Sequence, residues 1–136
     1  MDTHNITAVF NQGMSFTSHI NGHKVITDSN SEGAGDGPSP KRLMLASLAG
    51  CTGIDVVSIL SKMKVAFSDF TIDVSAGLTE EHPQIYRDVV IIYKIKMADD
   101  DKPKMEKAVK LSEEKYCGVS AMFRAFSKVE HKIVYL

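Results

Sequence analysis

The sequence of 136 residues has little cysteine, no excess of one charge and no signal-like start. Only two cysteines occur, Cys51 and Cys117, which excludes a disulfide-stapled miniprotein and a four-thiolate zinc site. Lys and Arg number 16 against 17 Asp and Glu, and this balance argues against a protein that neutralises nucleic-acid phosphates. The first residues lack a basic segment followed by an apolar one, so we expect a cytoplasmic protein with reduced thiols.

The apolar content, 43% of residues, is sufficient for the core of one domain covering residues 1–136. One stretch, residues 43–60, is long enough to raise the question of a membrane span. It contains Asp55 and two glycines, and a charged residue at the centre of a bilayer costs about 2.5–3.5 kcal/mol. We therefore interpret the stretch as a buried helix and expect no membrane association.

The hydrophobic periodicity predicts an α+β fold built on an antiparallel sheet. Alternating residues between 5 and 28 indicate three short strands, with a two-residue turn at Asn21-Gly22. The segment 29–40 is predicted to be a loop, and its glycines at 33–37 lack the spacing of a dinucleotide-binding motif. The remaining predicted elements are a helix over 40–64, strands over 70–78 and 85–97, a helix after Asp99-Asp100-Asp101 that breaks at Cys117-Gly118, a short helix over 119–126 and a strand over 129–136.

The predicted helix over 40–64 carries apolar residues on nearly every face. Ser39 is a suitable N-cap and Pro40 a suitable first helical residue. A helix that is apolar all round must be surrounded by protein. Because a short chain has little material with which to surround it, we expect a partner subunit to cover part of this long central helix.

Each cysteine has two interpretations on its own sequence. Cys51 in the middle of the helix could simply be a buried small hydrophobic residue, which is common for free cysteine. Cys117 precedes a helix N-terminus, where unpaired N–H groups stabilise a thiolate. Asp55 follows Cys51 by one helical turn and could orient a base or make a structural hydrogen bond. The five histidines are interpreted as surface or packing residues, so no metal is expected.

Two segments, PSPKRLMLASLAGCTGIDVVSIL and LSEEKYCGVSAMF, resemble the OsmC/Ohr family, and within it the YhfA-like branch. The resemblance covers essentially the whole chain. It implies an OsmC-like fold and an intertwined homodimer with the long helices in its core. It also implies a thiol peroxidase that reduces organic hydroperoxides, with Cys51 as the peroxidatic and Cys117 as the resolving cysteine. Such an enzyme needs no cofactor but requires an external dithiol reductant.

The sequence departs from the peroxidase members of this family at two positions. Those members use an Arg from the N-terminal strands and a Glu directly after the Pro of the helix start, whereas residues 1–41 contain no arginine and Lys41 follows Pro40. Asp55, Lys41 and Arg42 are the remaining candidates to assist the thiols. The alternative hypothesis is therefore a dimer without catalytic activity that binds a small apolar ligand at the subunit interface.

Overall fold

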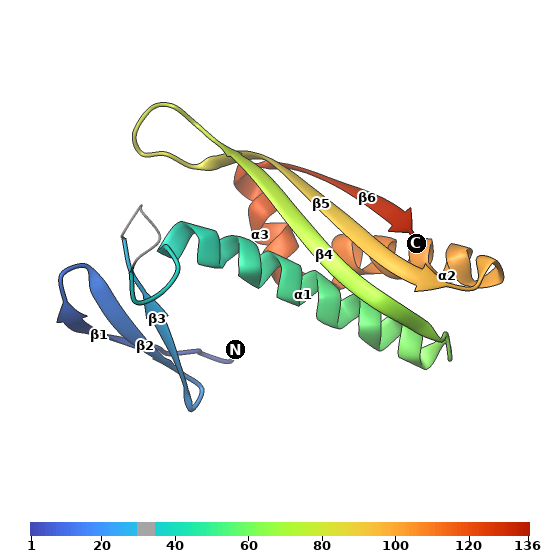
Figure 1. Cartoon of the computed structure of the whole chain (residues 1–136), viewed down its shortest axis with the longest axis horizontal. Helices are drawn as coiled ribbons and strands as arrows, with labels where there is room; N and C mark the ends of the chain where they lie inside the picture. Colours follow the sequence, from blue (N-terminus) through green and yellow to red (C-terminus); the bar gives the residue numbers. More distant parts are fainter. Residues whose placement is uncertain (30–34) are drawn as a thin grey trace. The chain divides into compact units, whose positions relative to one another are not determined.

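The computed structural model describes residues 1–29 and 35–136. Its contacts divide the chain into two compact units, residues 1–44 and 45–136 (Figure 1). Residues 30–34 of the predicted loop over 29–40, including Gly33, lie outside the described residues. The prediction of one domain over residues 1–136 stays a prediction.

The N-terminal unit is a three-stranded antiparallel sheet, as the alternation predicted. Its strands lie in the order β1-β2-β3 and have the bounds β1 Thr7–Gln12, β2 Ser15–Ile20 and β3 His23–Thr27. Asn21 and Gly22 have φ angles of 53° and 80°, the left-handed values that a type I′ turn requires. Ser15 is the one described residue of this unit that is fully buried. The sheet therefore has no core of its own.

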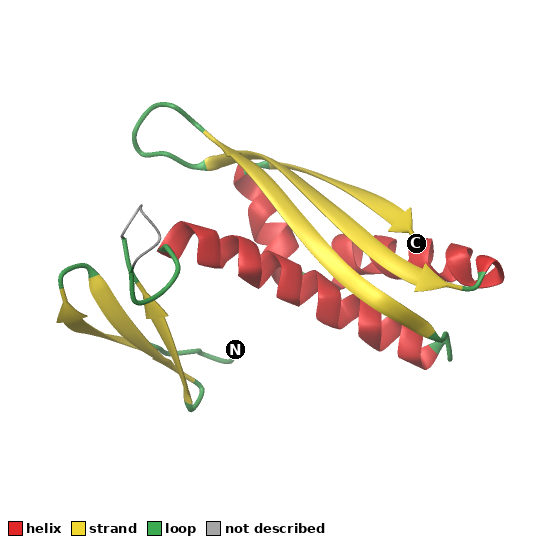
Figure 2. Ribbon diagram, viewed as in Figure 1, coloured by secondary structure: helices red, strands yellow, loops and turns green. Residues whose placement is uncertain are grey.

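The C-terminal unit combines a second three-stranded sheet with helices on one of its faces (Figure 2). The chain between β5 and β6 runs through helices and returns to the end where β5 began, so β6 pairs parallel to β5. The prediction of an antiparallel sheet is confirmed for β4 and β5 and is wrong for β5 and β6. The elements are α1 Pro40–Lys62, which begins in the N-terminal unit, β4 Phe67–Leu78, β5 Tyr86–Met97, η1 Asp99–Asp101, α2 Lys102–Leu111, η2 Ser112–Tyr116, α3 Gly118–Phe126 and β6 Lys128–Tyr135.

The central strand β5 supplies much of the core. Its alternate residues are fully or almost fully buried on the face that the helices cover: Val89, Ile91, Tyr93 and Ile95. From α1, the side chains at every fourth position, Leu48, Val56 and Leu60, join the same core cluster. A Cβ on Gly53 would lie 2.9 Å from Cδ1 of Ile72, so glycine permits α1 to lie close to β4.

Helix α1 begins as predicted, with the backbone N–H of Arg42 donating to Ser39 Oγ at 3.4 Å. In the single chain, however, only one face of the helix is buried, and Ile54 on the opposite face is 72% exposed. By length and composition alone α1 could cross a membrane, but its buried stripe packs in the core cluster. The expected covering of α1 on every side remains a prediction about the assembled protein.

Candidate active site

Cys51 lies on α1 beside the stripe that packs into the core. Its neighbour in that stripe, Thr52, is buried and satisfies its hydroxyl by donating to the backbone oxygens of Leu48 and Ala49. Asp55 follows one turn later on the same face, and both Cys51 and Asp55 are half-buried. This side of α1 therefore presents a thiol and a carboxylate at the edge of the core.

Cys117 is the N-cap residue of α3. Its Sγ accepts a hydrogen bond from the backbone N–H of Ser120 at 3.2 Å, and its side chain is almost completely buried. The preceding segment η2 is a short π-helix, and the N–H of Cys117 closes it by donating to the Ser112 oxygen at 2.7 Å. Such π turns change the direction of the following side chain and occur frequently at functional sites. The predicted helix break at Cys117 is confirmed.

The fold brings these side chains together. The sulfurs of Cys51 and Cys117 and a carboxylate oxygen of Asp55 all lie within 4.8 Å of one another, and both cysteines are free thiols. Ser112, which is fully buried, donates its Oγ hydrogen to Oδ2 of Asp55 at 2.9 Å. This bond ties the segment before Cys117 to α1. The cysteines are 66 positions apart in sequence, so only the tertiary fold could create this cluster.

The surroundings of Cys117 favour its protonated form. Burial raises the pKa of the Cys117 thiol to about 12, and the hydrogen bond that it shares with Cys51 acts in the same direction. The bond from the Ser120 N–H lowers the pKa, while the charges of Cys51 and Asp55 raise it further. At neutral pH Cys117 is therefore protonated in the folded protein.

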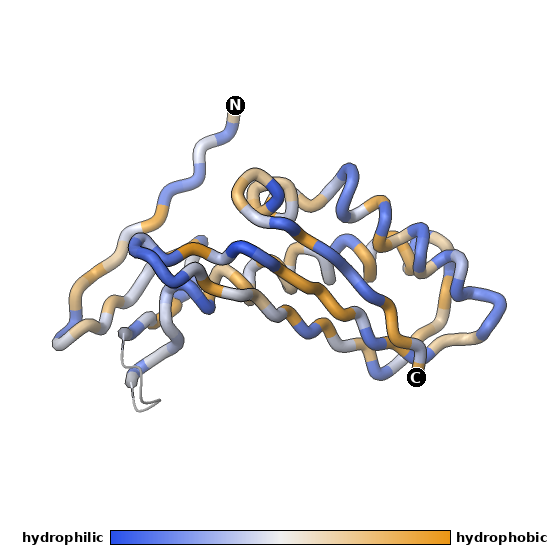
Figure 3. Tube along the Cα trace, turned by 90° about the horizontal axis from the view of Figure 1, so that it is seen from above, coloured by the Kyte–Doolittle hydropathy of each residue, from blue (hydrophilic) through white to orange (hydrophobic). Residues whose placement is uncertain are grey.

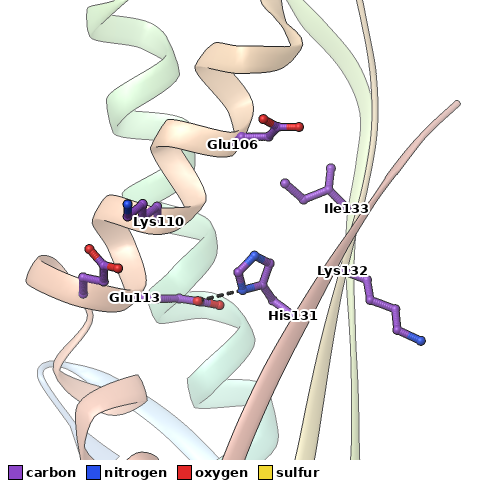
Figure 4. Close-up of a pocket in the computed structure, with 7 residues that line it drawn as sticks. Glu106, Lys110, Glu113, His131, Lys132 and Ile133 are labelled. Carbon is purple, nitrogen blue, oxygen red and sulfur yellow. Dashed lines mark ion pairs between the residues drawn. The ribbon is translucent and has the colours of Figure 1, made fainter.

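A pair of polar side chains, Glu113 and His131, joins the π-helix to β6. Oε2 of Glu113 accepts from Nδ1 of His131 at 2.8 Å (Figure 4). Strand β6 has a hydrophilic middle, residues 130–132, between hydrophobic residues (Figure 3). Burial raises the pKa of Glu113 although His131 and Arg124 lower it. Glu113 belongs to the π-helix η2, and its carboxylate contacts His131 of β6.

Two of the candidate assisting residues are not members of the thiol cluster. Lys41 and Arg42 occupy the first turn of α1, belong to the N-terminal unit and have exposed side chains. Sequence reasoning overlooked Ser112, whose contact with Asp55 depends on the π turn that no sequence pattern indicated. Asp55 itself accepts the structural hydrogen bond that was one of its two predicted roles.

An apolar groove runs along the exposed side of α1 and β4. It has a volume of about 710 Å³ and is lined by small and apolar residues, among them Gly50, Gly53, Ile54, Val57 and Ile72. Gly50, Gly53, Ile54 and Val57 lie on α1 outside its fully buried stripe, and Ile72 lies on β4. The groove is therefore a separate feature from the thiol cluster.

Comparisons with known proteins agree with the fold and with the resemblance of the sequence. The OsmC-like protein family model matches residues 33–132. Protein YhfA of Escherichia coli K12 is 32% identical over 122 residues, covering 88% of this chain and 89% of YhfA. A hypothetical protein from Aquifex aeolicus VF5 superimposes with a TM-score of 0.83 at 27% identity, covering 100% of this chain and 99% of the other.

A more distant structure shares the fold. The organic hydroperoxide resistance protein OhrB of Bacillus subtilis superimposes with a TM-score of 0.64 at 16% identity, and the match covers 97% of this chain and 98% of OhrB. The fold common to these proteins is α+β, with two small sheets and one long helix. The family match, the relative and the fold together show that this chain belongs to the OsmC family, in its YhfA-like branch.

Proposed function

We propose that the protein is a thiol-dependent reductase of organic hydroperoxides. The observation that carries this proposal is the pair of free thiols whose sulfurs lie within 4.8 Å of each other. An S–S bond is about 2.05 Å long, so a modest movement of side chains would join them. Family membership supports the proposal, since OhrB is named for organic hydroperoxide resistance.

The reaction has two thiol steps. In the first, the thiolate of one cysteine attacks the peroxide O–O bond, the alkoxide takes up a proton and leaves as an alcohol, and the sulfur becomes a sulfenic acid. In the second, the other thiol attacks the sulfenic sulfur, forming the disulfide and releasing water. An external dithiol then reduces the disulfide, and its own two thiols become the oxidised pair.

The roles of the two cysteines follow from their surroundings. Cys51 is half-buried at the edge of the core, so a peroxide can approach it, whereas Cys117 is only 3% exposed. Because burial raises the pKa of Cys117 to about 12, it is poorly suited to make the first attack and serves as the resolving thiol. Asp55, held by Ser112, is a positioning residue between the two.

The assembly and location belong to the same proposal. A homodimer would cover Ile54 and Val57, two exposed apolar residues of α1. Lys41, Arg42 or the partner subunit would supply the cation that stabilises a thiolate, since the family's N-terminal arginine is absent from residues 1–41. A cytoplasmic location would keep both thiols reduced between turnovers.

A second candidate function is supported by the groove along α1. Its volume of about 710 Å³ and its apolar lining suit a small apolar ligand at a subunit interface. Lys41, which stands where peroxidase members have Glu, favours this candidate in place of catalysis.

The two candidates predict different results in a steady-state assay with an organic hydroperoxide and a dithiol. We expect the wild-type chain to consume peroxide, Cys51→Ser to abolish consumption and Cys117→Ser to leave a sulfenic acid that a dimedone probe traps. Asp73→Asn, an exposed substitution on β4, is the matched control and should retain full activity. Consumption that survives in Cys51→Ser would contradict the role proposed for Cys51, and a wild-type chain that consumes no peroxide would favour the ligand-binding candidate.

A further inference from the structure

We infer that the reduced Cys51–Asp55–Cys117 cluster binds one thiophilic divalent cation, with Zn²⁺ as the physiological class of ligand. This goes beyond the proposed peroxide chemistry and does not depend on it. It also departs from the sequence-based expectation of no metal, which considered histidines and a four-thiolate site but not two thiols with a carboxylate.

The spacing of the three ligand atoms suits a tetrahedral ion. Zn–S bonds of about 2.3 Å place two zinc-bound sulfurs about 3.8 Å apart, and a Zn–O bond is shorter still. The ligand atoms of Cys51, Asp55 and Cys117 lie within 4.8 Å of one another, so a contraction of at most about 1 Å between the sulfurs, and of slightly more between each sulfur and the oxygen, brings them to this geometry. Small rotations of the two thiols are sufficient for such a change.

The chemistry of the donor set selects the class of metal. Two thiolates and one carboxylate prefer borderline or soft ions such as Zn²⁺ and Cd²⁺ over Mg²⁺ or Ca²⁺, which require oxygen ligands. Three protein ligands leave a fourth position for water or another exchangeable group. Binding replaces the Cys117 proton, since a metal-bound thiol is deprotonated even where burial opposes ionisation.

The surroundings of the ligands resemble the support that metal sites require. The Oγ–H of Ser112 bonds to Oδ2 of Asp55 at 2.9 Å and fixes the carboxylate, one oxygen of which lies within 4.8 Å of both sulfurs. The Ser120 N–H bonds to Sγ of Cys117 at 3.2 Å and partly neutralises a thiolate there. In the metal-bound form the two thiolates and the Asp55 carboxylate bring three negative charges together, and a divalent cation would offset two of them.

The test uses Cd²⁺ as the probe, because cadmium–thiolate bonds give an ultraviolet charge-transfer band. The full-length reduced protein should bind one Cd²⁺ per chain, Zn²⁺ should displace it and Mg²⁺ should not. We expect Cys51→Ser and Cys117→Ser to lose about 100-fold or more in affinity, and Asp55→Asn and Ser112→Ala about 10-fold. Cys117→Ser retains an oxygen that can cap α3, and circular dichroism checks that each variant is folded.

Several results would overturn the inference. Wild-type affinity in either cysteine variant would do so, as would binding that His131→Gln abolishes, since the ion would then lie at the Glu113–His131 pair. One Cd²⁺ per two chains would place the site between subunits and not in this cluster. Asp73→Asn is the control and should bind as the wild type does. The readout contains no peroxide, so cadmium binding can succeed where peroxide reduction fails, and the reverse.

Discussion

The two units of this chain differ in how their apolar residues are covered. In the C-terminal unit, strand β5 and helices α1, α2 and α3 bury a continuous core. In the N-terminal unit, Phe10 and Phe16 form an edge-to-face pair across β1 and β2, yet these residues are 58% and 40% exposed. A three-stranded sheet needs a covered hydrophobic face to be stable by itself. The C-terminal unit therefore positions the thiol cluster with its own core residues. The N-terminal sheet, in contrast, needs apolar surface from outside itself to be stable.

The largest contrast is expected in native-state hydrogen exchange. Amides of β5 should exchange only through global unfolding, while amides of β2 should exchange through openings that cost several kcal/mol less. The reason is the buried core around Ile91 and Tyr93, which β2 lacks. Mass-resolved exchange on peptides of the intact protein measures both. Equal protection of the amides in β2 and β5 would contradict the proposed difference in stability between the two units.

Core truncation should show the same contrast at single residues. Leu60→Ala removes a fully buried side chain of α1 and should lower the free energy of unfolding by about 2–5 kcal/mol. Val9→Ala, at an exposed position of β1, should cost about 1 kcal/mol or less. Urea denaturation gives both values, with the exposed substitution Lys62→Ala as the control on α1. A loss at Val9 as large as that at Leu60 would mean that the N-terminal sheet is tightly covered.

The exposed apolar face of α1 allows a test of whether a second copy of the chain covers it. Ile54→Lys places a charge on the apolar groove and should weaken self-association about tenfold or more, because an unpaired charge would be buried in the proposed dimer. Sedimentation velocity over a concentration series measures this effect. Ser61→Lys, on the same helix but outside the lining of the groove, is the matched control. A wild-type chain that sediments as a folded monomer at micromolar concentration would contradict the proposed dimer.

A smaller effect is expected from pH in the C-terminal unit. Because burial raises the pKa of Cys117 from about 9 to about 12, the folded protein keeps this proton at pH values where the unfolded chain has lost it. The corresponding stability is fully present below about pH 9 and is lost as the pH rises toward 12. Cys117→Ser should therefore lose less stability than the wild type between pH 8 and 10, as measured by urea denaturation at about these pH values. Parallel curves for the two proteins would show that Cys117 is not the group responsible.

Local patterns predicted much of the fold because their physical causes are local. The turn at Asn21-Gly22 needs positive φ angles, and Ser39 caps α1 through its own next turn, so both were predicted correctly. The direction of β6 depends instead on where two helices return the chain, which no periodicity records. The two cysteines were identified through a family resemblance, but the partnership of Ser112 with Asp55 required the π turn and therefore the structure.

The most direct test of the account is to treat the fully reduced protein with one equivalent of an organic hydroperoxide and map its disulfides by mass spectrometry. The account predicts that both thiols disappear together and that Cys51 and Cys117 of the same chain are joined, since their sulfurs already lie within 4.8 Å. Two free thiols after treatment, or a disulfide that joins different chains, would contradict it.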